Sequence, residues 1–429
     1  MTQHLRRRLR HSVYLPLSPA CLRAVARVLR WLPKSAGAGE VRRILVPQPH
    51  NSLGDLALCI PFLDEVHRLW PDAVIDMIVG NAMTALFEGI PFVGRVYPFT
   101  PSRWRAPLAR YQDTLRLVNL CRRFEASHDM ALDIRWDSDA YGYMARLAGY
   151  LSGSAIRAGY SGRVDGQDPM LDGFLTHIAL GGNGEHELLR KLRVLARAGL
   201  SPRHIEDSAC LEASESLKTI AIGAAPGMRA VLDAAGVPRD QPYAVLAPSA
   251  SAAMRIWPPE RLSAVARALG DSFGLQFVVM GSGREVALCE SVAAAIPGRA
   301  VSVAGKTGVT QICALLAGAS LFIGNDSGPA HIAGLLGTNT VTVSVFPASL
   351  NGLDHVNAPR RFRPCGPRVR VVQPERPLEP CKQVCEQTTA HCITQVTETT
   401  VLAACNALLT AAHGSLPPVT AELSQVSCG

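Results

Sequence analysis

The sequence predicts an α/β protein with two domains in tandem, each built around a parallel sheet covered by helices. Two observations lead to this prediction. From Arg42 onward, short β-rich runs alternate with helical segments, which is the pattern of a parallel sheet. The chain also has 429 residues, more than one hydrophobic core usually supports. The domain junction is expected between Ser201 and Pro242, where Pro, Gly and Ala mix without a strong strand.

In the first half, hydrophobic runs predict the strands, and apolar residues at helical spacing predict the helices. The expected strands are 44–47, 74–79, 93–97, 130–134 and 157–160, and the expected helices are 56–69, 108–124 and 185–199. Strands and helices alternate, as successive parallel strands require.

The second half repeats the pattern. The expected strands are 243–247, 275–280, 300–303, 321–323 and 340–345, and the expected helices are 260–269, 285–295, 311–317 and 330–336. We therefore divide the chain into a basic extension (1–40), a first domain (41–215), a second domain (216–411) and a flexible tail (412–429).

Composition excludes two classes of protein. No uncharged apolar run reaches the 18 residues that a membrane-spanning helix needs. Aromatic residues make up 6% and do not alternate with basic ones, so we expect no nucleic-acid partner. Much of the net charge of +8 comes from the first 43 residues, which lack the apolar core of a secretory signal. The pattern of residues 22–32 predicts a short basic amphipathic helix, for which two interpretations stay open: contact with an anionic membrane surface, or packing on its own domain.

Twelve cysteines without a signal peptide indicate reduced thiols in the cytosol. Cys381, Cys385 and Cys392 are close in sequence, and His391 is adjacent. Their C-x3-C-x6-C spacing does not match a zinc site made of two cysteine pairs. We therefore expect no metal centre, and we expect the scattered cysteines elsewhere to be small core residues.

The segment from Gly324 to His331 reads GNDSGPAH and follows an apolar run. A strand, a glycine-containing turn and a helix in this order offer backbone N–H groups to a phosphate. Asp326 and Ser327 could instead only cap the helix, whereas Gly328 fits a turn that opens a helix. His331 is compatible with either a structural or a catalytic role.

Two further loops follow predicted strands, where ligands gather in open α/β sheets. Asp55 begins the helix after the first strand, so it is either an N-cap or a general base. In the second domain, Ser249 and Ser251 precede Arg255, and together these residues could bind a diphosphate. The alternative is an ordinary loop with an exposed arginine. The dinucleotide fingerprint and the P-loop spacing are both missing.

These motifs resemble glycosyltransferase family 9, the heptosyltransferase family of lipopolysaccharide core assembly, over roughly residues 42–405. The motifs are Asn51-Ser52-Leu53-Gly54-Asp55, Arg255-x-Trp257-Pro258, Ala304-Gly305-Lys306-Thr307 and Asn325-Asp326-Ser327-Gly328-Pro329-x-His331-x-Ala333. The resemblance implies a GT-B fold, with two Rossmann-like, doubly wound domains facing across a cleft. It implies inverting transfer from a nucleotide sugar, with neither a metal ion nor a cofactor. Arg255 stands where the family commonly has lysine, which replaces a point charge by a planar fork.

By matching position, Asp55 would be the catalytic base. Ser327 and Gly328 would hold the diphosphate, Asp326 would contact the sugar, and Glu285 would reach the ribose. The full donor-binding set is Ser249, Ser251, Arg255, Glu285, Asp326, Ser327, Gly328 and His331. The acceptor set is Asn51, Ser52, Arg135, Arg157 and Arg163, of which the three arginines could equally be ordinary surface charges.

The expected function is therefore transfer of a sugar, heptose from ADP-heptose in the first instance, to a lipopolysaccharide-core or related acceptor. The partners are a nucleotide-sugar donor and an anionic glycolipid. The expected location is the cytoplasm, with peripheral contact to the inner membrane as an open addition. Two alternatives remain: a nucleotide-sugar epimerase of similar architecture, which would need a second acid/base group near the sugar, and a non-catalytic sugar-nucleotide-binding protein.

Overall fold

The structure is a computed structural model that describes residues 41–102, 107–135, 140–161, 169–180, 185–203, 208, 211–353, 355 and 358–412. The basic extension 1–40 lies outside these ranges, and so does the expected tail apart from its first residue. Within the described ranges, none of the helices combines the length and hydrophobicity needed to cross a bilayer.

The first half is a six-stranded parallel sheet with the order β3-β2-β1-β4-β5-β6. Its strands are β1 (Arg43–Gln48), β2 (Val74–Val79), β3 (Val93–Pro98), β4 (Met130–Asp133), β5 (Ile156–Tyr160) and β6 (His177–Ala179). Its helices are α3 (Leu53–Ala57), α4 (Ile60–Leu69), α5 (Thr84–Glu88), α6 (Pro107–Cys121), α7 (Ala140–Leu151) and α8 (Glu187–Arg197), with 3-10 turns η1 (Asn81–Met83) and η3 (Pro169–Phe174).

The second half is also a six-stranded parallel sheet, with the order β12-β11-β10-β7-β8-β9. Its strands are β7 (Tyr243–Ala247), β8 (Gln276–Val279), β9 (Ala300–Ser302), β10 (Leu321–Asn325), β11 (Thr340–Val343) and β12 (Val369–Val372). Its helices are α9 (Glu215–Ala234), α10 (Pro259–Phe273), α11 (Val286–Ala294), α12 (Val309–Ala317), α13 (Gly328–Leu335), α14 (Pro359–Phe362) and α15 (Glu398–Ala412), with 3-10 turns η5 (Ala253–Arg255), η6 (Ala348–Leu350) and η7 (Cys392–Gln395).

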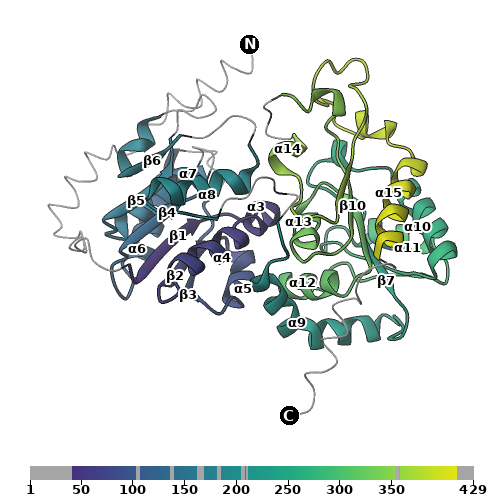
Figure 1. Ribbon diagram of the computed structural model, residues 1–429, viewed down its shortest axis with the longest axis horizontal. Coiled ribbons are helices and arrows are strands. Elements are labelled where there is room, and N and C mark those ends of the chain that lie inside the picture. The colour runs from purple at the N-terminus through teal and green to yellow at the C-terminus, as the bar shows by residue number, and fades with distance from the viewer. Residues whose placement is uncertain are drawn as a thin grey trace.

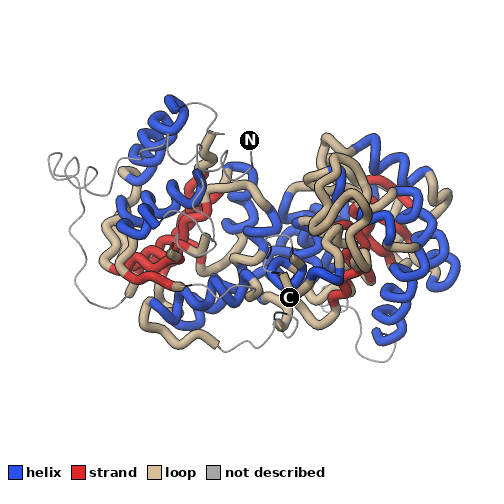
Figure 2. The backbone as a smooth tube through the Cα atoms, turned by 90° about the horizontal axis from the view of Figure 1, so that it is seen from above, coloured by secondary structure: helices blue, strands red, loops and turns tan. Residues whose placement is uncertain are grey.

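Both sheets have the same connectivity. In each, the first three strands are added in one direction from the first strand, and the chain then crosses back and adds the other three strands on its opposite side. In chain order this is 3-2-1-4-5-6, the doubly wound arrangement. Figure 2 shows the two groups of strands apart from each other, each with helices beside it. The order of the strands reverses between β1 and β4 in the first sheet and between β7 and β10 in the second. These two points are where ligands of such sheets bind.

One expectation about helices was wrong. The single helix expected over 56–69 is two helices, α3 and α4, with a break at Leu58 and Cys59. Pro61 causes the break, because it has no N–H for the carbonyl of Ala57 and its ring would collide with that carbonyl. The stretch from Ser201 to Pro242, where the domain junction is expected for lack of a strong strand, contains α9, a 20-residue helix with Pro226 inside it.

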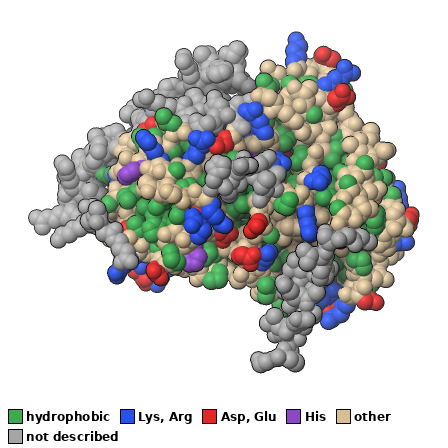
Figure 3. Space-filling model, in the orientation of Figure 1, with side chains coloured by type: hydrophobic (Ala, Val, Ile, Leu, Met, Phe, Trp, Pro, Cys, Tyr) green, Lys and Arg blue, Asp and Glu red, His purple; other side chains and the backbone are tan. Residues whose placement is uncertain are grey.

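The two halves meet over a continuous apolar core rather than through a thin linker. Side chains from α4 and α5, such as Phe62 and Phe87, belong to the same buried cluster as Cys313 of α12 and Ile332 of α13. Figure 1 shows α3 beside α13, and α5 beside α9 and α12. On the face drawn in Figure 3, basic and acidic side chains are interspersed with hydrophobic ones.

A buried ion pair also joins the halves. Glu187, at the start of α8, accepts a hydrogen bond from Arg361 of α14 at 2.7 Å, and both side chains are almost fully buried. Arg190 donates to the same carboxylate oxygen at 2.6 Å. This three-residue group fixes α14 of the second half against α8 of the first.

Candidate active site

Asp55, Arg255 and the turn at 326–328 lie at the two points where the strand order reverses. In the first sheet, β1 leads into α3, which contains Asp55. In the second sheet, β7 leads into the loop that ends at Arg255, and β10 leads into the turn that opens α13. The carboxyl ends of these strands therefore place loops far apart in sequence at one junction.

Asp55 is not the N-cap of its helix. Ser52 occupies the cap position of α3, and Asp55 lies in the first turn, half-buried. In the described ranges its carboxylate forms no hydrogen bond or ion pair. The capping interpretation therefore does not explain this residue, and the carboxylate is available to a bound molecule.

The turn at 326–328 has backbone N–H groups that can bind a ligand at the junction of the two halves. Ser327 has an extended backbone, with φ of −153° and ψ of 170°, and makes no side-chain cap bond. The N–H of Ala330 donates to the carbonyl of Ser327 at 3.1 Å, and Pro329 has no N–H group. In the part of the chain that the structure describes, the amides of Ser327 and Gly328 donate to no backbone carbonyl. They are the donors that α13 can offer to an anion.

Asn325 positions this turn, and sequence reasoning gave it no role of its own. Its side chain is buried at the end of β10. Its Oδ1 accepts from the backbone N–H of Trp257 at 2.8 Å, and its Nδ2 donates to the carbonyl of Pro248 at 2.9 Å. The loop that ends at Arg255 is thus tied at both ends to the strand that precedes Asp326. An amide side chain at a strand end next to a glycine turn is the sequence signal that could have identified it.

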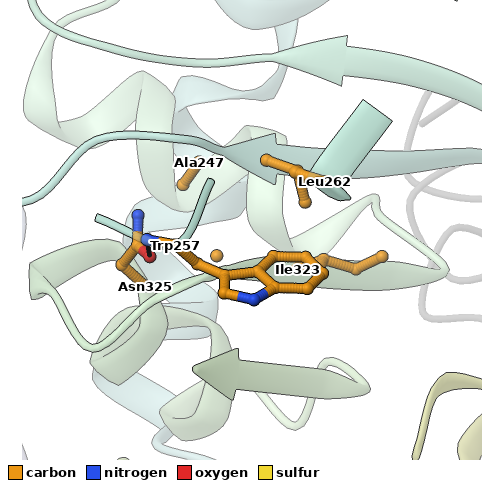
Figure 4. A pocket seen from close by; sticks show the side chains of 6 residues that line it. Ala247, Trp257, Leu262, Ile323 and Asn325 are labelled. Carbon is orange, nitrogen blue, oxygen red and sulfur yellow. Dashed lines mark hydrogen bonds between the residues drawn. The ribbon is translucent and has the colours of Figure 1, made fainter. Parts of the chain in front are cut away.

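Figure 4 shows the recess behind this tie, where the Trp257 ring lies beside Ile323 and Asn325 lies at the edge. The lining is almost entirely apolar and comes from Ala247, Trp257, Leu262, Ile323, Gly324 and Asn325. The indole Nε1 donates to the carbonyl of Val396 at 2.9 Å. The side chains fill this space, so the recess is packing that supports the site and not a substrate pocket.

The first turns of α3 and α13 are in direct contact. A Cβ placed on Gly54 would lie 3.1 Å from Cδ2 of His331 and 3.6 Å from Cα of Gly328. A Cβ placed on Gly328 would lie 2.8 Å from Cβ of Leu53. Real Cβ atoms do not approach so closely, so glycine at 328 allows the two halves to meet here.

His331 lies between two carboxylates, one from each half. Burial lowers its pKa, although the charges of Asp326 and Asp55 act to raise it. Its Nδ1 is buried and has no hydrogen-bond partner among the described residues. Burial raises the pKa of Asp326, against the effect of His331 and Arg255. His331 is therefore neutral at pH 7 and differs from a structural histidine with both nitrogens satisfied.

The remaining donor residues lie in neighbouring loops of the second sheet. Arg255 ends η5, and its positive charge acts on Asp326. Glu285 precedes α11 and accepts from the backbone N–H of Ser282 at 2.6 Å. Burial would raise the pKa of Glu285, but hydrogen bonds from Ser282 and from the Ser249 hydroxyl hold it below 4.5. Ser251 is exposed in the same loop as Ser249.

Two of the expected acceptor residues belong to the loop before α3. Asn51 is exposed, yet its side chain is in use: Nδ2 donates to the hydroxyl of Thr100 at 3.2 Å, and Oδ1 accepts from the backbone N–H of Ala82 at 3.1 Å. Ser52 is exposed at the cap position of α3. Asn51 therefore shapes the loop, and Ser52 faces solvent beside Asp55.

Two buried cations accompany this loop, and the sequence singled out only one of them. Arg135 follows β4, and Lys191 lies on α8; both are buried. Burial and the charges of Arg135 and Lys191 lower the pKa of His50 well below its ordinary value. Burial raises the pKa of Cys59 to about 11, and the charges that act on it are Lys191, Asp55 and Arg135. The positive charges of Arg135 and Lys191 therefore influence His50 and Cys59, which lie in the same segment of the chain as Asp55.

Arg157 does not join this group. It lies near the amino end of β5, whereas α3 follows the carboxyl end of β1. Its Nε donates to the carbonyl of Phe174 at 2.7 Å, and a terminal nitrogen donates to the carbonyl of Ser154 at 2.6 Å. We therefore leave Arg157 out of the proposed acceptor site. Arg163 lies outside the described residues.

Part of the chain is similar in sequence to known heptosyltransferases. The family model "Glycosyltransferase family 9 (heptosyltransferase)" matches residues 188–391. Lipopolysaccharide heptosyltransferase 3 of Escherichia coli K12 is 26% identical over 306 residues, which is 71% of this chain and 81% of that protein. A second E. coli protein of the same name is 27% identical over 310 residues, 71% of this chain and 82% of that protein.

Solved structures give the fold. The family 9 glycosyltransferase from Veillonella parvula aligns with a TM-score of 0.65 at 17% identity, over 86% of this chain and 97% of that one. E. coli heptosyltransferase WaaC with ADP aligns with a TM-score of 0.64 at 16% identity, over 85% and 99%. The two parallel six-stranded sheets are thus those of a GT-B architecture. These comparisons support a heptosyltransferase-like protein that resembles glycosyltransferase family 9, and the chain is a glycosyltransferase.

Proposed function

We propose that this enzyme moves a heptose from ADP-heptose to a lipopolysaccharide-core or related surface-glycan acceptor, with inversion at the sugar carbon and without a catalytic metal ion. One observation carries the proposal: Asp55 from the first half and the Ser327–Gly328 turn from the second half meet at one junction. Inverting displacement needs a base and a leaving-group site on opposite faces of the reacting carbon. Each half supplies one of them.

In the proposed reaction, Asp55 takes the proton from an acceptor hydroxyl as that oxygen bonds to the anomeric carbon. The bond from this carbon to the diphosphate oxygen breaks at the same time, and its electron pair leaves with the nucleoside diphosphate. The amides of Ser327 and Gly328, at the positive end of α13, and the guanidinium of Arg255 would stabilise that charge. Asp326 would hold the sugar.

One feature supports transfer without a metal ion. Arg255 and the amino-terminal end of α13 would together neutralise the charge of the leaving diphosphate.

The donor and acceptor are proposed from the relatives and from charge. The relatives in sequence are named lipopolysaccharide heptosyltransferase 3, and WaaC, which shares the fold, was solved with ADP. Buried Arg135 and Lys191 near Asp55 would favour an acceptor that carries phosphate or carboxylate groups. An anionic glycolipid of that kind would bring the enzyme to the membrane surface where the lipid lies.

The test compares Asp55→Asn with the parent enzyme and with Asp72→Asn, a carboxylate changed on the surface of the same half. Loss of the general base should lower kcat by about 10²- to 10⁴-fold, with donor affinity unchanged. The Asp72→Asn variant should match the parent. Near-parent turnover by Asp55→Asn would refute its assignment as the base.

A donor screen identifies the nucleotide. ADP-, GDP-, UDP- and TDP-sugars are compared by thermal shift, because a ligand that binds only the native state raises its stability. We expect the ADP-sugar to give the largest shift. Conversion of the sugar nucleotide to an isomer without any acceptor would instead indicate an epimerase.

A further inference from the structure

Four potential metal ligands meet in the segment between β12 and α15, where the sequence spacing led us to expect none. The ligand atoms of Cys381, Cys385, His391 and Cys392 all lie within 4.8 Å of one another. The three cysteines are buried, and His391 is half-buried. The C-x3-C-x6-C spacing differs from that of a zinc site made of two cysteine pairs, and spacing alone does not count His391 as a ligand. The fold instead brings the imidazole in as a fourth ligand.

Two distances from the imidazole nitrogen to sulfur match a tetrahedral zinc ion, and the other ligand atoms lie within 4.8 Å of one another. Zinc lies about 2.3 Å from sulfur and about 2.0–2.1 Å from imidazole nitrogen, so a tetrahedral site places sulfur and nitrogen about 3.6 Å apart. Nδ1 of His391 is 3.7 Å from Sγ of Cys381 and 3.5 Å from Sγ of Cys392. The group therefore has room for a single ion at its centre.

The neighbours of the sulfur atoms are those that thiolates need. The backbone N–H of Leu378 donates to Sγ of Cys392 at 3.5 Å, and the side-chain amide of Gln387 donates to Sγ of Cys381 at 3.8 Å. Such N–H groups around a metal site orient the ligands and partly neutralise their charge. Donors directed at sulfur would be of little use to a neutral thiol.

Other buried cysteines of this chain behave differently. Sγ of Cys59, Cys313 and Cys289 each points to a backbone carbonyl, those of Asp55, Val309 and Met280 respectively. This is the arrangement of a small core residue whose S–H donates. Cys381, Cys385 and Cys392 instead lie against one another and against the imidazole of His391. Among the described residues, none of these three thiols donates to a carbonyl.

We propose that Cys381, Cys385, His391 and Cys392 bind one structural zinc ion. With four protein ligands the site is closed, so the ion holds the chain and takes no part in sugar transfer. The segment it would hold supports the donor loop: Val396 accepts from the Trp257 indole at 2.9 Å, and Thr394 accepts from Arg261 at 2.6 Å.

The experiment measures metal in the full-length chain, expressed with zinc in the medium and purified without chelator or metal-affinity resin. Inductively coupled plasma mass spectrometry should find about one zinc ion per chain. Cys385→Ser and Cys392→Ser should each lower the zinc content to background. Cys405→Ala, a buried cysteine of the same core outside the group, should keep it.

A second measurement uses the parent protein, so that it tests the site even if the serine variants fail to fold. The parent protein is stripped and refilled with cobalt, which should give the strong sulfur-to-cobalt absorption and the visible bands of a tetrahedral thiolate site. Zinc removal should also lower the Tm of the parent, and zinc addition should restore it.

Three results would overturn the proposal. These are a parent chain that neither contains zinc nor takes up cobalt, a disulfide between two of the three cysteines, and equal zinc in Cys385→Ser, Cys392→Ser and parent. Iron at the same stoichiometry would overturn the assignment to zinc. None of these outcomes depends on the identity of the sugar donor.

Discussion

Replacing Gly328 by alanine should separate the two halves of the enzyme at the point where they meet. The new Cβ would lie 2.8 Å from Cβ and 2.9 Å from Cγ of Leu53. Nonbonded carbon atoms prefer about 3.5–4.0 Å, so the first turns of α3 and α13 must move apart by roughly 1 Å. Overpacking of this kind costs about 1–3 kcal/mol of stability. If Asp55 and the diphosphate turn act together, a displacement of that size should lower kcat about 10²-fold.

The assay is steady-state kinetics with donor and acceptor varied, together with urea denaturation. Gly223→Ala in α9 is the control, because no atom lies within 4 Å of its added Cβ. That control should keep its activity and gain about 0.5–1 kcal/mol, since glycine weakens a helix interior. Leu53→Gly, which removes the colliding atoms, should restore part of the rate lost in Gly328→Ala. Parent-like kcat/KM in Gly328→Ala would refute the view that this contact sets the geometry of the site.

Two further predictions concern stability. Glu187→Gln should lower the free energy of unfolding by about 3–5 kcal/mol, because it removes the carboxylate charge that pairs with the buried guanidinium groups of Arg361 and Arg190; urea denaturation that shows no loss would contradict this. For Glu65, burial would raise the pKa, but hydrogen bonds from Arg68 and Arg203 lower it to about 2. Its ionised form should therefore stabilise the fold above pH 4.5 by about 1–2 kcal/mol, since both arginines are partly exposed, and this should fade as the pH falls toward 2. The parent should then lose its advantage over Glu65→Gln between pH 4.5 and about 2 in denaturation curves.

Most strands of both sheets were predicted, because buried parallel strands are short apolar runs bounded by turns, whereas the edge strands β6 and β12 were missed. Strands expected over 74–79 and 243–247 have those bounds in the structure. The turn at 326–328 was predictable for the same reason, since glycine and proline mark where β10 stops and α13 starts. Local sequence decides these features.

Features decided by tertiary contacts were not predictable in this way. Helix α9 contains Pro226 and several glycines and alanines, yet forms because Leu217, Ile220 and Met228 are buried against the rest of the core. The roles of Asn325 and Lys191 depend on which strand ends are neighbours, and that follows from the order of the sheet. Single-residue spacing carries no such information.

The continuous apolar core has a practical consequence for experiments on this enzyme. Because side chains of α4, α5, α12 and α13 share one buried cluster, each half obtains part of its stability from the other. The two halves should therefore melt as one cooperative unit, and a donor bound only at the second sheet would protect reporter groups in the first. A single tryptophan such as Trp70, on the first half, could then report donor binding in solution from a domain that the donor does not touch.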